Sequence, residues 1–492
     1  MQRAGAAAAA EIALRYHDRL AGGVAVYAGP GNNGGDAWVV ARALTTSGVR
    51  VRVIEPVPAK TPDACAERAL AFEQLNDHDE AAARRLDDRG EMLVVDGLLG
   101  TGSTGAPRGE IARAVAAIRA SRQRGGVVIA LDVPTGVDAS TGAAADDAVD
   151  ADLSVTFGTL KRGHLVQRER CGAIVVLDIG LGRHAELNDA APRLVDESWV
   201  AAQLPRIPTD ANKGIRKKLA IVGGARGMAG AAMLAARAAL RSGIGMVKLV
   251  VASDTLPIVQ EAEPYALAAE WPHDDAAVDH TIGTWADAVV IGPGLGRDDQ
   301  SRAVLERVLA CWRGPMLLDA DALTLFEKRA RELGAALGGR PAVVTPHPVE
   351  FSRLAGVPVD RVLDERFDIG AELASTLGAA VLLKGVPTVI SAPDGARFVS
   401  ATGTAALATA GSGDVLSGIA GTLLAQIGDP VIAGAAGAWV HGRAAERVPS
   451  AGGVRGVALE DILEELRGSW LLDDRPLRYP LLAELPLAGS GA

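Results

Sequence analysis

Short β-branched runs alternate with alanine-rich helical stretches along most of the chain. This alternation is typical of parallel α/β folds, in which a crossover helix follows each strand. It predicts two three-layer α/β/α sandwiches, with helical patterns such as 63–75 and 111–122 between the strands. The expected strands are 24–28, 49–54, 93–95, 127–131, 153–157 and 173–177 in the first half, and 219–222, 247–251, 288–291, 316–318, 342–344, 380–383 and 388–390 in the second.

The segment 188–213 interrupts the alternation with three prolines and little sustained periodicity. A chain of 492 residues is long for one hydrophobic core, so a domain boundary is expected where the periodicity stops. We place this boundary near residues 203–207. The sequence therefore predicts a first domain at 1–205, a second domain at 206–475, and a loosely attached, proline-bearing tail at 476–492.

The charge balance and the cysteines limit the classes of function. The formal net charge is −10, whereas proteins that bind nucleic acids or membrane surfaces usually carry a basic face. The three cysteines lie far apart and form no CxxC pair, which favours neither a disulfide framework nor a zinc site. No uncharged apolar run is long enough to span a bilayer, and the N-terminus lacks a signal-peptide pattern. We expect a cytoplasmic protein whose partners are small molecules.

Three strands of the first half are followed by glycine-rich loops with oxygen-bearing side chains. These loops carry Asn33, Asp96 and Thr135, and the first of them reads AGPGNNGGDAW. The carboxyl ends of parallel strands share one edge of a sheet, so the three loops should converge. Glycine-rich turns and helix N-termini hold anions, whereas a set of oxygen ligands suits a hard cation. Each loop taken alone is also compatible with a plain strand-to-helix turn.

A second set of motifs points to phosphoryl transfer. A Gly-Ser-Gly-Asp turn ending at Asp414 opens an apolar helix, after an upstream Lys-Gly pair at Lys384 and a proline-framed His347. Backbone amides of such a turn can hold an anion that gathers charge during transfer, and Asp414 can take a proton from a hydroxyl. No GxxxxGK[ST] sequence occurs, so this is not a Walker P-loop. The roles left open are those of Asp319 and Asp321, which suit helix caps and catalytic groups equally, while His441 is expected in the core.

The first half resembles the NAD(P)H-hydrate epimerase family over roughly residues 5–185. The resemblance lies in PGNNGGD (30–36), DGLLGTG (96–102), LDVPTGVD (131–138) and TFGTLKRGH (156–164). That family interconverts the R and S hydrates of NADH and NADPH. The resemblance implies that Asp132 is the catalytic acid/base and that Asn33, Asp96 and Thr135 hold a potassium ion. It implies substrate contacts from Asn32, Asn33, Gly34, Gly35, Asp36, Gly100, Thr101, Gly102 and Asp132.

The second half resembles the ADP- or ATP-dependent NAD(P)H-hydrate dehydratases of the ribokinase-like superfamily, over about residues 207–465. The shared motifs are GMAGA, GPGLG, LDADAL, TPHP, LKG and the GSGD turn. The resemblance implies that Asp414 is the base that activates the hydroxyl of the S hydrate for phosphorylation, and that loss of phosphate then restores the nicotinamide. It implies hydrate contacts from Ala231, Gly294, His347 and Asp414, and nucleotide contacts from Lys384, Gly385, Val386, Pro387, Thr388 and Gly413.

Together the resemblances imply one polypeptide with a Rossmann-like epimerase domain and a ribokinase-like dehydratase domain. The expected ligands are the NADH and NADPH hydrates and ADP or ATP, with K+ and Mg2+, and a homo-oligomer is expected. The alternative is a vitamin or sugar kinase with a non-catalytic N-terminal binding domain. The chain departs from the family patterns at Ala37, Val349, Thr404 and Ala405, and it begins without the usual first helix.

Overall fold

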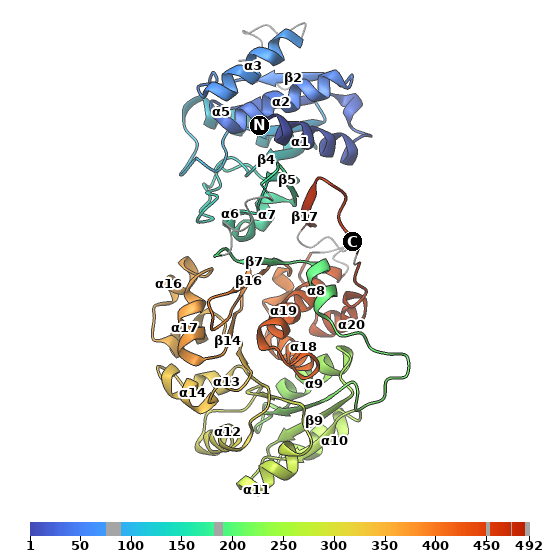
Figure 1. The fold of residues 1–492 in the computed structure, drawn as a ribbon, viewed down its shortest axis with the longest axis vertical. Coiled ribbons are helices and arrows are strands. Elements are labelled where there is room, and N and C mark those ends of the chain that lie inside the picture. Colours follow the sequence, from blue (N-terminus) through green and yellow to red (C-terminus); the bar gives the residue numbers. More distant parts are fainter. Residues whose placement is uncertain (75–89, 182–189, 449–452, 474, 488–492) are drawn as a thin grey trace. The chain divides into compact units, whose positions relative to one another are not determined.

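The computed structural model describes residues 1–74, 90–181, 190–448, 453–473 and 475–487. Two units form, each around its own sheet (Figure 1). The first unit joins residues 1–189 to residues 476–488, and the second begins at residue 190 and extends to residue 475. The division lies about fifteen residues before the boundary near residue 205 that the prolines suggested, because β7 (Arg193–Val195) pairs with a strand of the second sheet.

The first unit is a seven-stranded sheet in the order β17-β6-β5-β4-β3-β1-β2. All its neighbouring pairs are parallel except β17 with β6. Its strands are β1 (Val24–Ala28), β2 (Val51–Ile54), β3 (Leu93–Gly97), β4 (Val127–Leu131), β5 (Leu153–Phe157), β6 (Ala173–Leu177) and β17 (Leu481–Leu485). Its helices are α1 (Gln2–Arg15), α2 (Asn32–Thr46), α3 (Pro62–Gln74), α5 (Gly109–Gln123), α6 (Arg162–Val166) and α7 (Arg168–Cys171). The expected helix 63–75 corresponds to α3, and its last residue, Leu75, lies outside the described residues.

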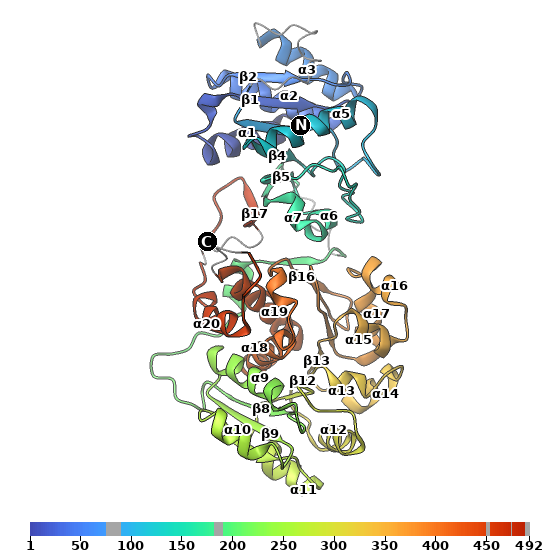
Figure 2. The ribbon, with the colours of Figure 1, turned by 180° about the vertical axis from the view of Figure 1, so that it is seen from behind.

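Side chains of the first sheet alternate between two hydrophobic cores, so the unit has three layers. On β1, Val24 and Val26 pack in one core with residues of α1 and α2, whereas Ala25 and Tyr27 pack in the other with residues of α5. The six expected strands of this half are all present, within two residues of their expected ends. The three-layer α/β/α prediction is therefore confirmed for this unit (Figure 2).

The order of the strands locates the crevice in which a ligand can bind. The chain runs from β1 outward to β2 and then returns to β3 on the other side of β1, so the topology switches between β1 and β3. In doubly wound sheets, loops leaving the carboxyl ends of the strands diverge at this switch point, and ligands bind in the crevice between them. Asn33 is the second residue of α2, the helix that follows β1, and Asp96 is the residue before the last of β3, so both lie at this switch point.

The segment expected to be a loose tail is part of the first sheet. Strand β17 pairs with β6 in antiparallel register and buries Ala483 and Leu485. Arg478 Nη2 lies 2.5 Å from Oε1 of the buried Glu11 of α1, and Arg15 Nη1 lies 2.9 Å from Glu484 Oε1. Residues 488–492 of that expected tail lie outside the described residues. The first unit is therefore completed by residues that follow the second unit in the chain.

Ending the chain after Arg475 should destabilise the first unit alone. The truncation removes two buried apolar side chains and the Arg478–Glu11 ion pair, and it opens the hydrogen-bonding edge of β6. Burial of a leucine-sized side chain contributes about 1.5–3 kcal/mol, so we expect a loss of roughly 2–4 kcal/mol. The thermal transition of the first unit should fall by about 4–16 °C. A variant ending at Leu487 is the control, and an unchanged transition after the longer truncation would contradict the role of β17.

The second unit is a ten-stranded sheet in the order β10-β9-β8-β11-β12-β13-β14-β15-β16-β7. Its strands after β7 are β8 (Lys218–Val222), β9 (Met246–Val251), β10 (Leu267–Glu270), β11 (Ala288–Ile291), β12 (Met316–Leu318), β13 (Ala342–Val344), β14 (Ala380–Leu383), β15 (Thr388–Ser391) and β16 (Arg397–Ser400). Its helices are α8 (Glu197–Gln203), α9 (Ala229–Arg241), α10 (Leu256–Ala262), α11 (Asp275–Val278), α12 (Asp299–Cys311), α13 (Asp321–Thr324), α14 (Ala330–Leu337), α15 (Pro348–Ala355), α16 (Val359–Asp364), α17 (Ile369–Leu377), α18 (Ser412–Ile427), α19 (Pro430–Arg447) and α20 (Leu459–Ser469).

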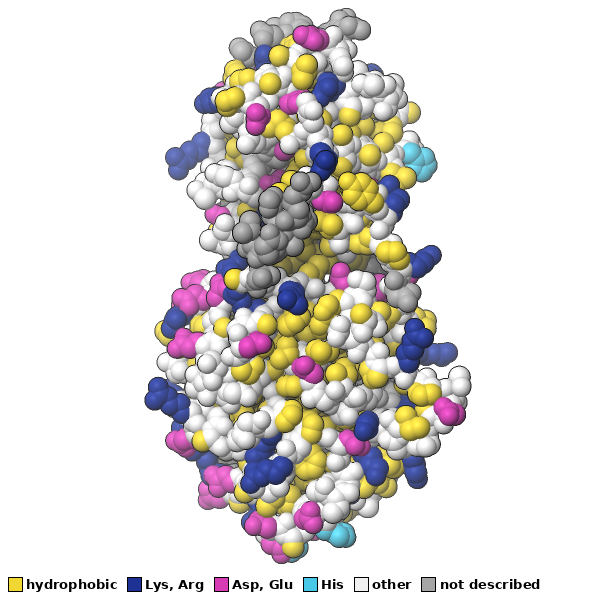
Figure 3. Space-filling model, in the orientation of Figure 1, with side chains coloured by type: hydrophobic (Ala, Val, Ile, Leu, Met, Phe, Trp, Pro, Cys, Tyr) yellow, Lys and Arg dark blue, Asp and Glu magenta, His cyan; other side chains and the backbone are white. Residues whose placement is uncertain are grey.

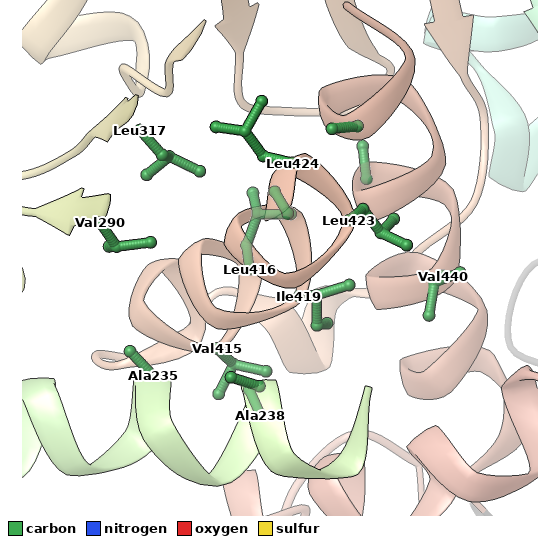
Figure 4. Packing of buried hydrophobic residues seen from close by; sticks show 14 of the residues in the cluster. Ala235, Ala238, Val290, Leu317, Val415, Leu416, Ile419, Leu423, Leu424 and Val440 are labelled. Carbon is green, nitrogen blue, oxygen red and sulfur yellow. The ribbon is translucent and has the colours of Figure 1, made fainter. Parts of the chain in front are cut away.

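Helix α18 lies at the centre of one core of the second unit. Its side chains, including Ile419 and Leu423, pack against alanines of α9, residues of α19 and the strands β11 and β12 (Figure 4). Small residues allow close approach: a Cβ at Gly418 would lie 2.1 Å from the carbonyl oxygen of Ala235. Residues of α12, α14, α15 and α17 form a second core on the other face of the sheet. The three-layer prediction is thus confirmed for this unit also. The packing of α18 fixes the position of the turn at its N-terminus.

The surface of the second unit carries charged side chains of both signs (Figure 3). On the face drawn in Figure 3, its basic and acidic side chains are interspersed. Within the described residues, no helix is both long and apolar enough to cross a bilayer.

Candidate active sites

The glycine-rich stretch after β1 is the first turn of a helix, and two of its glycines are required by packing. Helix α2 begins at Asn32, directly after Gly31. A Cβ at Gly29 would lie 1.7 Å from the carbonyl oxygen of Leu98, and a Cβ at Gly34 would lie 1.8 Å from that of Gly29. Only glycine permits these approaches, because real Cβ atoms do not come so close to backbone. The loops after β1 and β3 are thereby pressed together at the switch point.

Asn33, Asp96 and Thr135 meet at this edge of the first sheet. Asn33 Nδ2 donates to the carbonyl oxygens of Leu99, at 2.9 Å, and Leu131, at 3.1 Å. Thr135 Oγ1 donates to Asp96 Oδ1 at 2.7 Å and accepts from the backbone N–H of Leu99 at 3.1 Å. The expected convergence of the three loops is therefore present, with Leu99 between the three side chains.

Two oxygen atoms of this group make it suitable for a cation. Asn33 Oδ1 is buried and accepts no hydrogen bond from the described residues. Asp96 is fully buried, and burial raises the pKa of its carboxyl to about 6, although hydrogen bonds from Thr135 and Leu98 oppose the shift. No ion pair to Asp96 forms among the described residues. A buried carboxylate without a cationic partner is costly, so a bound cation would stabilise it.

Asp132 follows β4 and lies in the left-handed region, with φ of +63°. A residue other than glycine in this region is strained by roughly 1–2 kcal/mol, and such strain is common at functional sites. Its Oδ2 accepts from the backbone N–H of Thr101 at 3.4 Å, and a Cβ on Gly100 would lie 3.5 Å from the same oxygen. The strained conformation thus turns the carboxylate toward the loop after β3.

Three residues of the segment 156–164 hold Asp132, and no individual role was predicted for any of them. Lys161 Nζ lies 2.6 Å from Asp132 Oδ1, and Thr156 Oγ1 donates to the same oxygen at 3.1 Å. His164 Nε2 donates to the backbone carbonyl of Asp132 at 2.6 Å, while its Nδ1 accepts from the N–H of Lys161 at 3.1 Å. Burial, followed by the charge of Lys161, lowers the pKa of His164 to about 4, so the ring is neutral at pH 7. The signal that could have found Lys161 and His164 is the Lys-Arg-Gly-His run shortly after β5, whereas Thr156 lies within that strand.

Asp36 is a second carboxyl group beside Asp132. Burial is the main cause that raises its pKa to about 7, and the negative charge of Asp132 adds to the shift. Its Oδ1 is buried and accepts no hydrogen bond from the described residues. Among the other expected substrate contacts, Asn32, Thr101 and Gly102 are exposed, whereas Gly34 and Gly35 are buried within α2. The structure therefore brings two carboxyl groups of unequal environment to one crevice, an arrangement that suits acid/base work.

In the second unit, Asp414 lies in the first turn of α18, after Gly411, whose φ is +93°. Burial is the largest cause that raises the pKa of Asp414 to about 7, and the negative charge of Asp319 is the next. Lys384 opposes the shift. The N–H of Ser412 donates to the carbonyl of Thr409 at 3.2 Å, which leaves the backbone amides of Gly413 and Asp414 available to an anion. A carboxyl group with a pKa near the working pH suits a general base.

Asp319 and Lys384 form an ion pair under this turn. Lys384 Nζ lies 2.8 Å from Asp319 Oδ1 and 3.8 Å from Glu350 Oε2. Burial alone would lower the pKa of Lys384, but the charges of Asp319, Glu350 and Asp414 raise it above its usual value, so the ammonium stays charged. A Cβ at Gly413 would lie 3.2 Å from Lys384 Nζ. The ammonium is therefore held against the backbone that precedes Asp414.

A cavity of about 550 Å³ opens beside the same turn. Five of the six residues expected to bind nucleotide line it, namely Lys384, Gly385, Val386, Thr388 and Gly413. The sixth, Pro387, is buried, and its carbonyl accepts from Arg366 Nη1 at 3.3 Å. The cavity has the volume of a small-molecule site and a mainly apolar lining with a few polar groups.

His441 and two of the departures from the family pattern also line this cavity. His441 is buried as expected, but its ring lies on the cavity wall, 3.4 Å from Ser412 Oγ. Burial, followed by the charge of Lys384, lowers the pKa of His441 to about 4, so it is neutral at pH 7. Thr404 and Ala405 also line the cavity, and Thr404 Oγ1 accepts from the N–H of Ala406 at 3.3 Å. These two residues therefore contribute to the wall without closing it.

The residues expected to face the hydrate are divided between two places. Ala231 and Gly294 meet beyond the carboxyl ends of the paired strands β8 and β11, where a Cβ on Gly294 would lie 3.1 Å from that of Ala231. His347 is at the rim of the cavity, where its Nδ1 accepts from the N–H of Val349 at 3.1 Å. Asp321 connects the two places: its Oδ2 accepts from the N–H of Gly296 at 3.0 Å, and its charge acts on Asp414.

The two remaining departures have simple surroundings. Ala37 is fully buried, and a Cβ on Gly97 would lie 2.5 Å from the Cβ of Ala37, so the glycine at the end of β3 makes room for the alanine. Val349 is exposed in the first turn of α15.

Comparisons with known proteins match both units. Residues 219–467 match the sequence model of a family described as NAD(P)H-hydrate dehydratase, and residues 1–163 match one described as YjeF-related protein N-terminus. The second unit also resembles the ADP/ATP-dependent NAD(P)H-hydrate dehydratase from Bacillus subtilis, co-crystallised with ATP and Mg2+. The TM-score is 0.51 at 30% identity, over 57% of this chain and 98% of that chain.

Relatives align with nearly the whole chain. The bifunctional NAD(P)H-hydrate repair enzyme Nnr of Coxiella burnetii is 36% identical over 475 residues, which are 95% of this chain and 93% of that protein. The enzyme of the same name from Escherichia coli is 35% identical, over 90% of this chain and 84% of that protein. Because both units are matched in one continuous alignment, the chain belongs to the family of bifunctional NAD(P)H-hydrate repair enzymes.

Proposed function

We propose that the first unit interconverts the R and S hydrates of NADH and NADPH, and that the second unit dehydrates the S form with ADP to give NAD(P)H, AMP and phosphate. The observation that carries the proposal is the position of Asp414, a half-buried carboxyl group in the first turn of α18, next to a cavity of nucleotide size. The first unit supplies the second carboxylate, Asp132, at its own strand edge.

In the first unit, Asp132 would exchange a proton with the hydrated ring. Lys161 and Thr156 both bind Oδ1, which leaves Oδ2 directed at the loop after β3. His164 fixes the backbone carbonyl of Asp132 and thereby its strained conformation. The N-terminal turn of α2, in which Asn32 is exposed, and the loop 100–102 would bind the pyrophosphate, since free helix amides attract anions.

In the second unit, Asp414 would remove the proton of the hydroxyl group of the S hydrate as that oxygen attacks the terminal phosphoryl group of the nucleotide. The first-turn amides of α18 would hold the charge that accumulates on the transferred group. Elimination of phosphate from the resulting ester then restores the dihydronicotinamide. Lys384, whose ammonium lies beside Gly413, would hold the nucleotide phosphates in line.

Mg2+ and K+ complete the proposed set of cofactors. Within the described residues, no group of three His, Cys, Asp or Glu side chains forms a ready metal site, so Mg2+ would be carried mainly by the nucleotide phosphates. The oxygen atoms of Asn33, Asp96 and Thr135 fit a potassium ion, because one of them has no donor and another belongs to a buried carboxylate without a cation. Such an ion would place a fixed positive charge beside the substrate site.

The direct test uses purified protein with a mixture of both hydrates. With ADP present, absorbance of the dihydronicotinamide should recover until both epimers are consumed. With vitamin or sugar hydroxyl compounds in place of the hydrates, no nucleotide should be consumed. Transfer of phosphate to such a compound, with no recovery of NADH, would instead favour a vitamin or sugar kinase. The same assay with ATP measures the nucleotide preference.

Potassium should stabilise the first unit specifically. Binding to the folded state raises the melting temperature in proportion to RT ln(1 + [L]/Kd), so KCl should raise the first thermal transition above its value in choline chloride of equal ionic strength. The Asp96→Asn variant should lose this difference, because it removes the charged ligand. Equal transitions in the two salts for the unmodified protein would argue against the cation site.

A further inference from the structure

Asp319 is the least exposed carboxylate among the described residues of the second unit, and no step of the proposed reaction uses it. It is 1% exposed and follows β12 directly. Oδ1 accepts from Lys384 Nζ at 2.8 Å, and Oδ2 accepts from Ser417 Oγ at 2.8 Å. Ser417 is one turn after Asp414 on α18. Asp319 therefore connects the end of β14 to the helix that carries the proposed base.

The backbone at Asp319 is held as firmly as its side chain. Its N–H donates to the carbonyl of Ile291 at 3.1 Å, and its carbonyl accepts from the N–H of Ala322 at 3.1 Å. A Cβ at Gly292 would lie 1.8 Å from the carbonyl oxygen of Asp319, so this approach requires glycine. Ala320, next in the chain, has φ of +49°, a conformation that costs a residue other than glycine roughly 1–2 kcal/mol. The chain thus fixes this carboxylate at the price of local strain.

Five further groups surround the same centre. The charges of Asp319 after β12, Lys384 after β14, Asp321 of α13 and Glu350 of α15 all act on the pKa of Asp414. The charge of Lys384 in turn acts on His347 at the start of α15 and on His441 of α19. Of these groups, Asp321 is paired with Arg297 at 2.7 Å, and Glu350 accepts from the N–H of His347 at 2.9 Å. Of these acids, Asp319 has the charge that acts most strongly on Asp414. Its own ion-pair partner is Lys384, one of the residues expected to bind the nucleotide.

We propose that Asp319 is a positioning residue for phosphoryl transfer: it holds Lys384 at the nucleotide phosphates and keeps Asp414 a strong enough base through its negative charge. The inference rests on the proposed function of the second unit. The geometry supports it in two ways. A Cβ at Gly413 would lie 3.2 Å from Lys384 Nζ and 3.6 Å from Asp319 Oδ2, so the pair lies directly against the residue before Asp414. Ser417 ties the same carboxylate to α18 one turn later.

The test is the pH dependence of dehydratase kcat/KM in the full chain. In the unmodified protein the rate should fall as the pH drops below about 7, because Asp414 must be ionised to accept a proton and burial raises its pKa. Asp319→Asn keeps the shape and removes the negative charge, so the pKa of Asp414 should fall. The acid limb should then move to lower pH by about one unit. The plateau should drop at least tenfold, and the KM for ADP should rise because Lys384 loses its partner.

Two matched variants separate charge from structure. Ser417→Ala keeps the carboxylate and removes only one hydrogen bond, so its acid limb should stay where it is. Asp319→Ser removes the negative charge with a smaller side chain, so its acid limb should also move to lower pH; this variant carries the test if Asp319→Asn does not fold, as judged by its thermal transition. An acid limb of Asp319→Asn or Asp319→Ser that coincides with that of the unmodified protein would overturn the proposal.

The same series distinguishes this inference from the function on which it rests. Asp414→Asn is assayed in parallel. If Asp414→Asn retains the full rate, the assignment of the base fails. If Asp414→Asn is inactive and Asp319→Asn keeps the acid limb of the unmodified protein, the function stands and only the role of Asp319 fails.

Discussion

Replacing Asp414 with Asn should reduce ADP-dependent recovery of NADH by about 10²–10⁴-fold, because the substitution keeps the shape of the side chain and removes the proton acceptor. The R and S hydrates should still equilibrate, since Asp132 belongs to the other unit. The measurement is dihydronicotinamide absorbance with mixed hydrates and ADP, together with chromatographic separation of the two epimers.

The control for this variant is Asp429→Asn. Asp429 caps the next helix, α19, by accepting from the N–H groups of Val431 and Ile432, and Asn caps helices equally well. Its rate should therefore be unchanged. Recovery of NADH at the full rate by Asp414→Asn would refute the kinase-like mechanism of the second unit.

Replacing Asp132 with Asn should divide the time course into two phases. The S hydrate is consumed at the normal rate, because the dehydratase is intact, and a slow tail set by spontaneous epimerisation follows. Loss of a positioned acid/base costs about 10²–10⁴-fold, so the tail should lie far below the first phase. The measurement is the amplitude and rate of the second phase with mixed hydrates and ADP.

Asp138→Asn provides the matched comparison, since Asp138 lies in the same loop and its carboxylate accepts from the N–H groups of Ser140 and Thr141 and from the Thr141 side chain. An Asn side chain can accept the same bonds, so a single phase is expected. A single phase in Asp132→Asn as well would mean either that the first unit is not an epimerase or that another group, such as Asp36, transfers the proton.

The sequence was sufficient for the core strands and for the convergence of loops. The buried parallel strands are short apolar runs, and their direction alone requires Asn33, Asp96 and Thr135 to share an edge. The strands that it missed lie at or near the edges of the two sheets: β7, β10, β16 and β17. Strand β10 reads LAAE, and β7 has only three residues, so neither shows an apolar run. These segments become strands because they pair with neighbouring strands of the sheet, and their own apolar pattern does not reveal it.

The parts of the sites that the sequence could not predict are the contacts between side chains. Lys384 and Asp319 come from β14 and β12, which are separated by β13, so their meeting depends on the side chains reaching past a strand. Lys161 lies in a loop that was recognised as a motif, but its distance from Asp132 is set by the left-handed turn at Asp132. His441 is buried, as expected. The sequence could not show that it lines the cavity of the second unit.

The first sheet cannot be completed until nearly the whole chain has been synthesised, because its strand β17 lies close to the C-terminus. The ribosome completes β6 long before it reaches Leu481, because residues 178–480 lie between them. At 5–20 residues per second these roughly 300 residues take about 15–60 s. Through that interval the nascent first unit presents the bare edge of β6, a surface that invites pairing with other chains. A chaperone that binds exposed strand edges should therefore associate with nascent chains that have passed residue 190 and leave them after Leu485 has emerged.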